Sequence, residues 1–118
     1  MEISNKVIED IVDSIVSVLG TNLTEETYHN AFELELSLRN IPFQTKVDVP
    51  VKYKDCYVGS LQADIVIPKS LIVELKAVSE RTGTDKFVNQ TRLYMKLLEI
   101  KKGVVINFWQ LPNIVWVD

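Results

Sequence analysis

The sequence has little of the residue types that hold small proteins together covalently or through zinc. Its 118 residues include one cysteine, Cys56, and one histidine, His29. An internal disulfide is therefore excluded, and the sequence contains no Cys/His cluster of the kind that binds structural zinc. We expect a fold that depends on a hydrophobic core, in a reducing, intracellular setting.

Long apolar runs are also missing. No stretch approaches the ~20 apolar residues that a membrane helix needs, and the opening MEISNKVIED lacks the pattern of a signal peptide. We therefore expect a cytoplasmic protein with no membrane partner. The length and the 47% hydrophobic content fit a single domain over residues 1–118.

The charge is unevenly distributed along the chain. The net charge is −3, but residues 1–44 hold 2 basic and 8 acidic side chains, whereas residues 45–102 hold 11 basic and 7 acidic. A basic middle segment favours a polyanionic partner. Scattered solvated lysines would give the same count, so the charge alone leaves both interpretations open.

Apolar residues at helical spacing predict three helices. The first covers residues 3–19 and ends at Gly20, because glycine favours helix C-termini. The second follows the N-cap candidates Thr21, Asn22 and Thr24 and continues to about Arg39. The third covers residues 85–101.

Alternating apolar and polar residues predict the strands. They cover about residues 46–52, 57–67, 71–78, 103–109 and a short terminal 114–117, with a turn at YKDCY and a polar loop at 79–84. Pro50 favours an edge position or a bulge in the first strand. The resulting order, α-α-β-β-β-α-β-(β), predicts a mixed α/β protein with a central mixed sheet flanked by helices.

The segment DIVIPKSLIVELK, residues 64–76, reads as an apolar hairpin with charged residues on one face. A tight turn at 68–70 pairs residues whose numbers sum to about 138, which places Asp64 opposite Glu74 with Lys76 on the same face. The alternate positions are expected to form one continuous apolar face: Leu61, Ala63, Ile65, Ile67, Leu71, Val73, Leu75 and Ala77.

Two carboxylates that face each other across a ladder repel. A divalent cation between Asp64 and Glu74 would reverse that repulsion, because Mg²⁺ prefers carboxylate oxygens. Lys76 could then act on an attacking water or stabilise developing charge. The alternative is that Glu74 and Lys76 form a solvent-facing ion pair of little consequence.

These residues resemble the PD-(D/E)XK nuclease superfamily, whose pattern is an acid at the end of one strand followed by (D/E)-x-K on the next. The chain is also similar, from about residue 8 to 109, to the GxxExxY protein family within that superfamily. The matching motifs are LGTNLTEETY with Gly20, Glu25 and Tyr28, the AD…VELKA hairpin, the pair Gln90 and Tyr94, and GVVINF from Gly103 to Phe108. Asn22 stands where that family has glycine, and asparagine tolerates a left-handed backbone.

The resemblance implies a restriction-endonuclease-like core and a site for Mg²⁺ or Mn²⁺. Its expected ligands are Glu25, Asp64, Glu74 and the backbone carbonyl of Leu75. Lys76 would be the catalytic lysine that acts on the nucleophilic water. Three further side chains, Gln90, Tyr94 and Tyr28, would line the site or contact the substrate.

Each of these residues also has an ordinary structural interpretation. Glu25 could be a first-turn acid favoured by the helix dipole, and Tyr28 could belong to the core. Gln90 and Tyr94 could form a plain helix face. Asn107 is either a hydrogen-bond partner of the site or a satisfied buried amide, and His29 is expected at the surface.

Two classes of function follow. The first is a metal-dependent nuclease that hydrolyses phosphodiester bonds, of DNA rather than RNA, with a metal-activated water. The second is a catalytically silent protein that keeps the nuclease fold as a binding or assembly module. Either could act as a homodimer or as a subunit of a larger complex, with Trp109, Leu111, Ile114 and Trp116 as interface or core residues.

Overall fold

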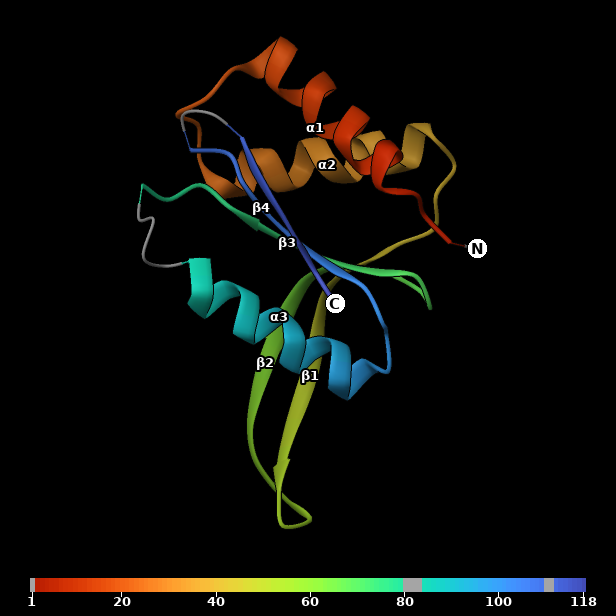
Figure 1. Cartoon of the computed structure of the whole chain (residues 1–118), viewed down its shortest axis with the longest axis vertical. Helices are drawn as coiled ribbons and strands as arrows, with labels where there is room; N and C mark the ends of the chain where they lie inside the picture. The colour runs from red at the N-terminus through yellow and green to blue at the C-terminus, as the bar shows by residue number, and fades with distance from the viewer. Residues whose placement is uncertain (1, 80–83, 110–111) are drawn as a thin grey trace.

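The computed structural model describes residues 2–79, 84–109 and 112–118. Within these ranges the elements follow the predicted order, α-α-β-β-β-α-β-β (Figure 1). They are α1 (Asn5–Leu19), α2 (Glu25–Leu38), β1 (Gln44–Tyr53), β2 (Cys56–Ile67), β3 (Leu71–Lys76), α3 (Thr84–Leu98), β4 (Gly103–Asn107) and β5 (Asn113–Val117). The prediction of a mixed α/β fold is confirmed.

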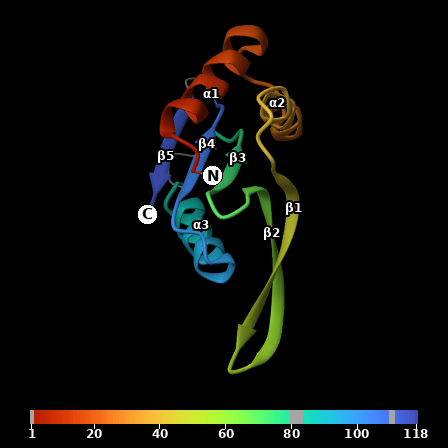
Figure 2. The same cartoon turned by 90° about the vertical axis from the view of Figure 1, so that its right-hand side faces the viewer.

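The strands form one mixed sheet in the order β1-β2-β3-β4-β5. Neighbouring strands are antiparallel except β3 and β4, which run parallel. A parallel pair needs a long crossover connection, and α3 supplies it. In Figure 2 the helices α1 and α2 lie together at one end of the molecule, away from α3. No helix within the described ranges has the length and apolar character that a membrane span requires.

Two apolar clusters fill the space between helices and sheet. The first joins buried residues of α1 and α2 to one face of the central strands, with Ile65, Val73 and Ile106 among its members. The second joins Tyr94 and Met95 of α3 to the opposite face. Alternate residues along β3 and β4 therefore point into different clusters, which is why these strands are apolar on both faces.

The expected single apolar face of β2 and β3 is wrong in part. Ile65 and Ile67 pack in the α1–α2 cluster together with Leu71, Val73 and Leu75, but Ala63 and Leu61 pack in the α3 cluster. The change occurs at Asp64, where the ladder between β1 and β2 skips Lys46, whose backbone is left-handed (φ 49°). The register is the same on both sides of this missing pair, since Thr45 pairs with Ile65 and Val47 with Ala63.

The ends of the helices follow from capping. Thr24 is the N-cap of α2, and its hydroxyl accepts a hydrogen bond from the Thr27 N–H. Gly20 ends α1, as predicted, with φ 71°, and Asn22 has φ 70°, which uses the left-handed tolerance predicted for asparagine. At the end of α3, Glu99 adopts φ 56°, and the helix ends at Leu98 instead of residue 101.

Other boundaries differ from the prediction by a few residues. α1 starts at Asn5 because Ser4 caps it, and β3 and β4 end at Lys76 and Asn107, before the predicted Val78 and Trp109. Of the predicted loop 79–84, residues 80–83 lie outside the described residues, and Thr84 already belongs to α3.

The hairpin of β1 and β2 extends well beyond the rest of the sheet (Figures 1 and 2). Its turn residues Lys54 and Asp55 both have positive φ, which suits a two-residue hairpin turn and confirms the predicted turn. Pro50 lies on an edge strand, and a register shift follows between Val51 and Lys52. Both features that Pro50 predicted are present.

The C-terminal apolar residues divide between core and surface. Ile114 and Trp116 are partly buried against the α1–α2 cluster, so the core interpretation holds for them. Trp109 is exposed. Leu111 lies outside the described residues.

Candidate functional site

The candidate site lies where β2 and β3 separate. Their ladder ends at the pair Ile65 and Val73, and the next pair in the same register is Asp64 and Glu74. There, Glu74 Oε1 accepts a hydrogen bond from the Asp64 N–H at 3.3 Å. Asp64 Oδ2 accepts one from the Leu75 N–H at 2.8 Å. The two acids therefore lie opposite each other, as predicted. At this position their side chains make the hydrogen bonds between β2 and β3 that backbone groups make in the rest of the ladder.

The same opening receives the backbone carbonyl of Leu75. Within a strand, the N–H and C=O of one residue point to the same side. The Leu75 N–H points toward β2, whereas the neighbouring Lys76 carbonyl accepts from the Phe108 N–H on the β4 side at 2.8 Å. The Leu75 carbonyl therefore points toward Asp64, as an expected ligand should.

Glu74 is a buried acid in an unfavourable electrostatic setting. Only 2% of the residue is exposed. Burial raises the pKa of its carboxyl to about 9, with the nearby Asp64 adding to the rise and Lys76 opposing it. A pKa raised in this way favours the protonated form of Glu74 at neutral pH.

Lys76 supplies positive charge at this place. Its side chain is half-buried, with Nζ 4.7 Å from the centre of the Phe87 ring. The ammonium lowers the pKa of both Glu74 and Glu25. Since Glu74 is buried and makes no ion pair within 4 Å with Lys76, the alternative of a solvent-facing pair is not supported.

Glu25 is the first residue of α2, and it lies near Asp64. The residue as a whole is exposed, but partial burial of its carboxyl raises its pKa, with Lys76 opposing that rise and Asp64 adding to it. Glu25 and Asp64 line one cavity of about 290 Å³ together with His29, Lys46 and Gln62. The structure thus brings Glu25 to the same cavity as Asp64.

His29 is not the surface residue that the sequence indicated. It is buried, with Nε2 2.8 Å from Thr45 Oγ1 and 2.6 Å from Glu33 Oε2. Thr45 of β1 and Glu33 of α2 contact its ring, and sequence periodicity did not show the contact with β1. The spacing of four that relates Glu25, His29 and Glu33 was a signal that these side chains share one helix face.

Tyr28 lies in the core and not in the cavity. It is fully buried, and its ring stacks on Phe108 with centroids 4.3 Å apart. Its hydroxyl donates to the Gly20 carbonyl at 2.8 Å and accepts from the Leu23 N–H at 3.3 Å. The expected substrate contact is not supported; Tyr28 instead holds the turn from which α2 and Glu25 begin.

Tyr94 of α3 lies near Asp64 and Glu74. It is 1% exposed, and its hydroxyl donates to the Gln62 carbonyl at 3.0 Å. Burial and the charges of Glu74 and Asp64 raise its pKa to about 12. Gln90, one turn earlier on α3, is half-buried. Tyr94 is placed to support β2 beside the site, whereas Gln90 is the more accessible of the two.

Asn107 acts as a satisfied amide. Its Nδ2 donates to the Val78 carbonyl at 2.9 Å, and its Oδ1 accepts from the Val78 N–H at 3.2 Å. The side chain thus replaces a ladder partner just after Lys76. It fixes the chain that leaves β3 and does not enter the site directly.

The donor set fits a hard divalent cation in part. Asp64, Glu74 and the Leu75 carbonyl provide adjacent oxygens of the kind that Mg²⁺ and Mn²⁺ prefer. A cation would also relieve the repulsion that raises the pKa of Glu74. Among the described residues, however, no three His, Cys, Asp or Glu side chains are arranged to hold an ion together. Glu25 is near but does not complete such a cluster.

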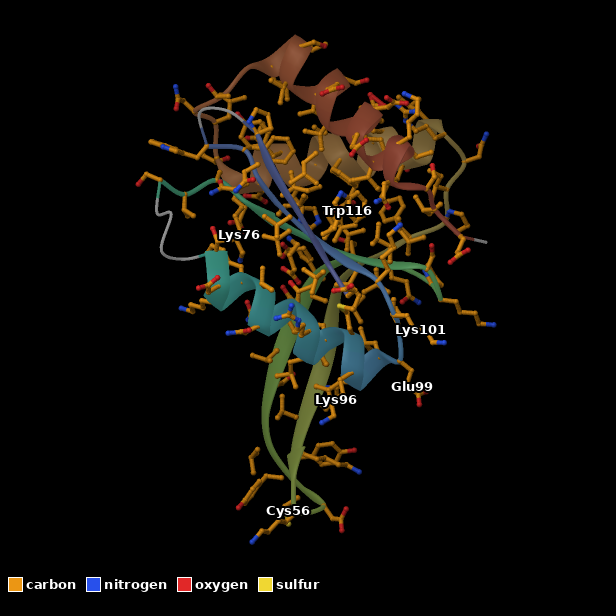
Figure 3. All side chains as sticks on the ribbon, viewed as in Figure 1. Cys56, Lys76, Lys96, Glu99, Lys101 and Trp116 are labelled. Carbon is orange, nitrogen blue, oxygen red and sulfur yellow. The ribbon has the colours of Figure 1, made fainter. Side chains whose placement is uncertain are left out.

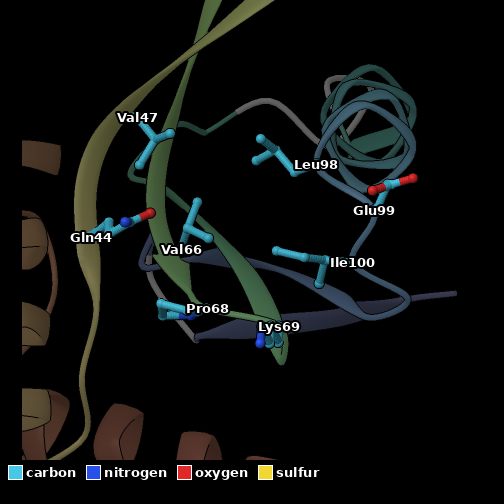
Figure 4. Close-up of a pocket in the computed structure, with 8 residues that line it drawn as sticks. All are labelled: Gln44, Val47, Val66, Pro68, Lys69, Leu98, Glu99 and Ile100. Atoms are coloured by element: carbon cyan, nitrogen blue, oxygen red, sulfur yellow. The ribbon is translucent and has the colours of Figure 1, made fainter.

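A second pocket lies beside the end of α3, at the base of the hairpin (Figure 4). Its volume is about 340 Å³, and its walls are largely apolar, with Lys69 and Glu99 among the lining residues. The predicted site residues, all within the described ranges, do not line it. The acids, Lys76 and the first cavity therefore remain the stronger candidate.

The comparisons with known proteins agree with this geometry. A family model described as the PD-(D/E)XK nuclease superfamily matches residues 1–115. The crystal structure of SSO0001 superposes with a TM-score of 0.63 at 18% identity, over 96% of this chain and 58% of that chain. This chain thus spans little more than half of that protein, and the likeness concerns the fold. No curated protein sequence matches. With its family model matched over nearly the whole length, the chain belongs to the PD-(D/E)XK nuclease superfamily.

Proposed function

We propose that this protein is a metal-dependent nuclease that hydrolyses phosphodiester bonds, of DNA rather than RNA. The observation that carries the proposal is the placement of Asp64 and Glu74 side by side at the opening of β2 and β3, with Lys76 close enough to lower the pKa of Glu74. A buried acid beside a second acid is unfavourable for stability alone. Its presence is explained if a cation belongs there.

Asp64, Glu74 and the Leu75 carbonyl would hold Mg²⁺ or Mn²⁺, and Glu25 lines one cavity with Asp64. Such an ion supplies positive charge against the phosphate and lowers the pKa of an attacking water. Lys76, held over the Phe87 ring, would orient the nucleophile and stabilise negative charge on the phosphate. Gln90 is the half-buried side chain available for a phosphate contact.

The contacts of Tyr28 support the finer resemblance to the GxxExxY family. Its hydroxyl bridges Gly20 and Leu23, so a motif of glycine, glutamate and tyrosine fixes the turn and the start of α2. Glu25 is the first residue of that helix. The tyrosine would serve catalysis by holding Glu25 in place and not by contacting substrate.

A second candidate function is a binding module without turnover. It is favoured by the lack of a ready cluster of three acidic or histidine ligands among the described residues. A catalytic subunit completed by another protein would show the same incomplete cluster. These alternatives predict nucleic-acid binding without metal-dependent cutting by the isolated chain.

The test is cleavage of circular duplex, single-stranded DNA and RNA with Mg²⁺, Mn²⁺ or EDTA. The wild type is compared with Lys76→Ala and with Lys6→Ala, a control at an exposed position of α1. We expect metal-dependent cleavage of DNA that falls at least 100-fold in Lys76→Ala, in line with the usual contribution of acid–base groups of ~10²–10⁴, and is unchanged in the control. Cleavage that survives Lys76→Ala, or no cleavage in any metal, would contradict the proposal.

A further inference from the structure

The outer part of the β1–β2 hairpin is a surface that the catalytic proposal does not use. We define the hairpin tip as residues 52–58, all of which are exposed. Tyr53 and Tyr57 are 63% and 69% exposed, so their rings contribute little to either core cluster. Figures 1 and 2 show the hairpin extending away from the helices, and Figure 3 places Cys56 at its end.

The tip presents a lysine–tyrosine pair on each face. Lys52 and Tyr57 are partners in the ladder, and the Lys52 Nζ lies 4.8 Å from the centre of the Tyr57 ring. Tyr53 follows Lys52 in the strand and therefore points to the other face. There, Lys54 Nζ lies 5.4 Å from the Tyr53 ring centre. Both faces thus offer an ammonium beside an accessible aromatic ring.

This chemistry fits a nucleic acid. Lysines bind phosphate oxygens, and exposed aromatic rings stack on bases without regard to their identity. A two-stranded ribbon is also narrow enough to enter the major groove of a duplex. From these observations we propose that the hairpin tip is a nucleic-acid-binding arm that holds the substrate at a distance from the catalytic acids. This inference rests on the proposed nuclease function for its choice of partner.

The distribution of charge supports the same partner. α1 and α2 together carry seven acidic residues and one lysine, and they lie at the end of the molecule opposite the tip. A polyanion would be repelled from that end and attracted to the tip, where Lys52 and Lys54 outnumber Asp55. The arm therefore extends in the direction from which a nucleic acid can approach.

The length of β2 sets the spacing between arm and site. Cys56 and Asp64 are eight residues apart in one strand, which corresponds to roughly 26 Å at ~3.3 Å per residue. The arm would then contact a duplex about 8 base pairs from the scissile phosphate, at ~3.4 Å per base pair.

A second copy of the chain is the competing occupant, because β1 is an edge strand. Pro50, the register shift after Val51 and the exposed lysines are the features by which edge strands avoid pairing with another strand. These features disfavour a dimer formed by adding strands at the hairpin, and they leave the nucleic acid as the partner.

The exposed Cys56 provides a reporter at the tip. The first experiment measures its alkylation by iodoacetamide with and without a 24-base-pair duplex or the matching single strand, in EDTA so that no strand is cut. We expect DNA to slow alkylation at least fivefold, and the more effective of the two forms identifies the preferred substrate. Unchanged alkylation with both DNAs would overturn the inference. It would also be overturned if Cys56 were alkylated slowly in the absence of DNA and sedimentation showed that the protein is a dimer.

The second experiment measures DNA binding by fluorescence anisotropy in EDTA. Tyr53→Ala with Tyr57→Ala should weaken binding about tenfold, and the Tyr→Phe pair should restore it because the rings return. Lys52→Gln with Lys54→Gln should reduce the slope of log Kd against log salt by about 2. Equal affinity in wild type and tip variants would overturn the inference. Control changes Lys6→Gln and Val18→Ala, at exposed positions of α1, should have no effect.

These results are independent of turnover. If the protein never cuts DNA but loses DNA binding when the tip is changed, the proposed role of the hairpin tip stands and the proposed nuclease function is refuted. If the protein cuts DNA with metal but binds DNA equally well without the tip side chains, the proposed nuclease function stands and the proposed role of the hairpin tip is refuted. Alanine at Tyr53 and Tyr57 leaves the core intact because both side chains are exposed, and a circular dichroism melt checks this.

Discussion

The Leu75 N–H donates to Asp64 Oδ2 at 2.8 Å, where a ladder partner on β2 would otherwise be expected. A side chain has taken the place of the backbone, and this allows β2 to turn away while β3 continues beside β4. The Leu75 carbonyl and the side chains of Asp64 and Glu74 face the gap that results between the two strands. The catalytic proposal therefore depends on how two strands separate, and not on the acids alone.

The stability of the metal-free protein should fall as pH rises. Glu74 has an ordinary pKa of 4.5 and a folded-state pKa of about 9. Between these values the folded protein binds a proton that the unfolded chain has released, so the free energy of unfolding decreases with pH. The stability from this group is complete below 4.5 and is lost as pH passes through 9. Urea unfolding from pH 5 to 9 with EDTA measures the effect.

In Glu74→Gln the same series should be flatter, because the titrating group is gone. Glu9→Gln, at an exposed position of α1, should keep the wild-type slope. A wild-type curve that is flat or rises over this window would show that Glu74 is not held protonated.

Binding of Mn²⁺ should release protons at neutral pH. Glu74 must lose its proton to become a ligand, and its raised pKa means that the proton is still present at pH 7. Calorimetric titrations in PIPES and Tris at pH 7 should therefore give different apparent enthalpies, with close to one proton released per ion. Equal enthalpies in the two buffers would indicate that Glu74 does not become a ligand.

Removing the Tyr28 hydroxyl should weaken both the fold and the site. Tyr28→Phe loses the hydrogen bonds to Gly20 and Leu23 but keeps the stack on Phe108. We expect a loss of about 1 kcal/mol in the free energy of unfolding. Cleavage should decline as well, since Glu25 begins directly after this turn. Tyr53→Phe at the exposed tip is the matched change and should leave stability unaltered.

Gly103 is required for the packing of α3 on β4. A Cβ there would come within 2.7 Å of Thr91 Cγ2 and 2.9 Å of Met95 Sδ. Gly103→Ala should lower the free energy of unfolding by about 1–3 kcal/mol, the usual effect of overpacking. At Gly59 a Cβ would meet no atom within 4 Å, so Gly59→Ala is the control with little expected effect. Equal stability of the two variants would contradict this account of the contact.

The sequence predicted the element order and the pairing of Asp64 with Glu74 because both follow from local rules. Residue alternation and the tight turn at 68–70 determine the register, and the observed pairs keep the predicted sum of 138. The capping role of Thr24 and the left-handed Asn22 are local in the same sense.

The failures depend on contacts between distant segments. Helical spacing allowed a core position for Tyr28, but its stacking partner Phe108 is 80 residues further along the chain, so no local pattern could decide between the core and a substrate contact. His29 is buried and contacts Thr45, which is 16 residues further along the chain. The change of face at Asp64 coincides with a left-handed Lys46, a conformation that lysine rarely adopts and that residue alternation does not predict.

The central claim is that Asp64 and Glu74 hold a divalent cation. The most direct measurement is a calorimetric titration of Mn²⁺ into the wild type, Asp64→Asn and Asp48→Asn, an exposed control on β1. The account predicts one ion per chain in the wild type and in the control, and at least tenfold weaker binding in Asp64→Asn. Equal binding in all three proteins, or no binding in the wild type, would contradict it.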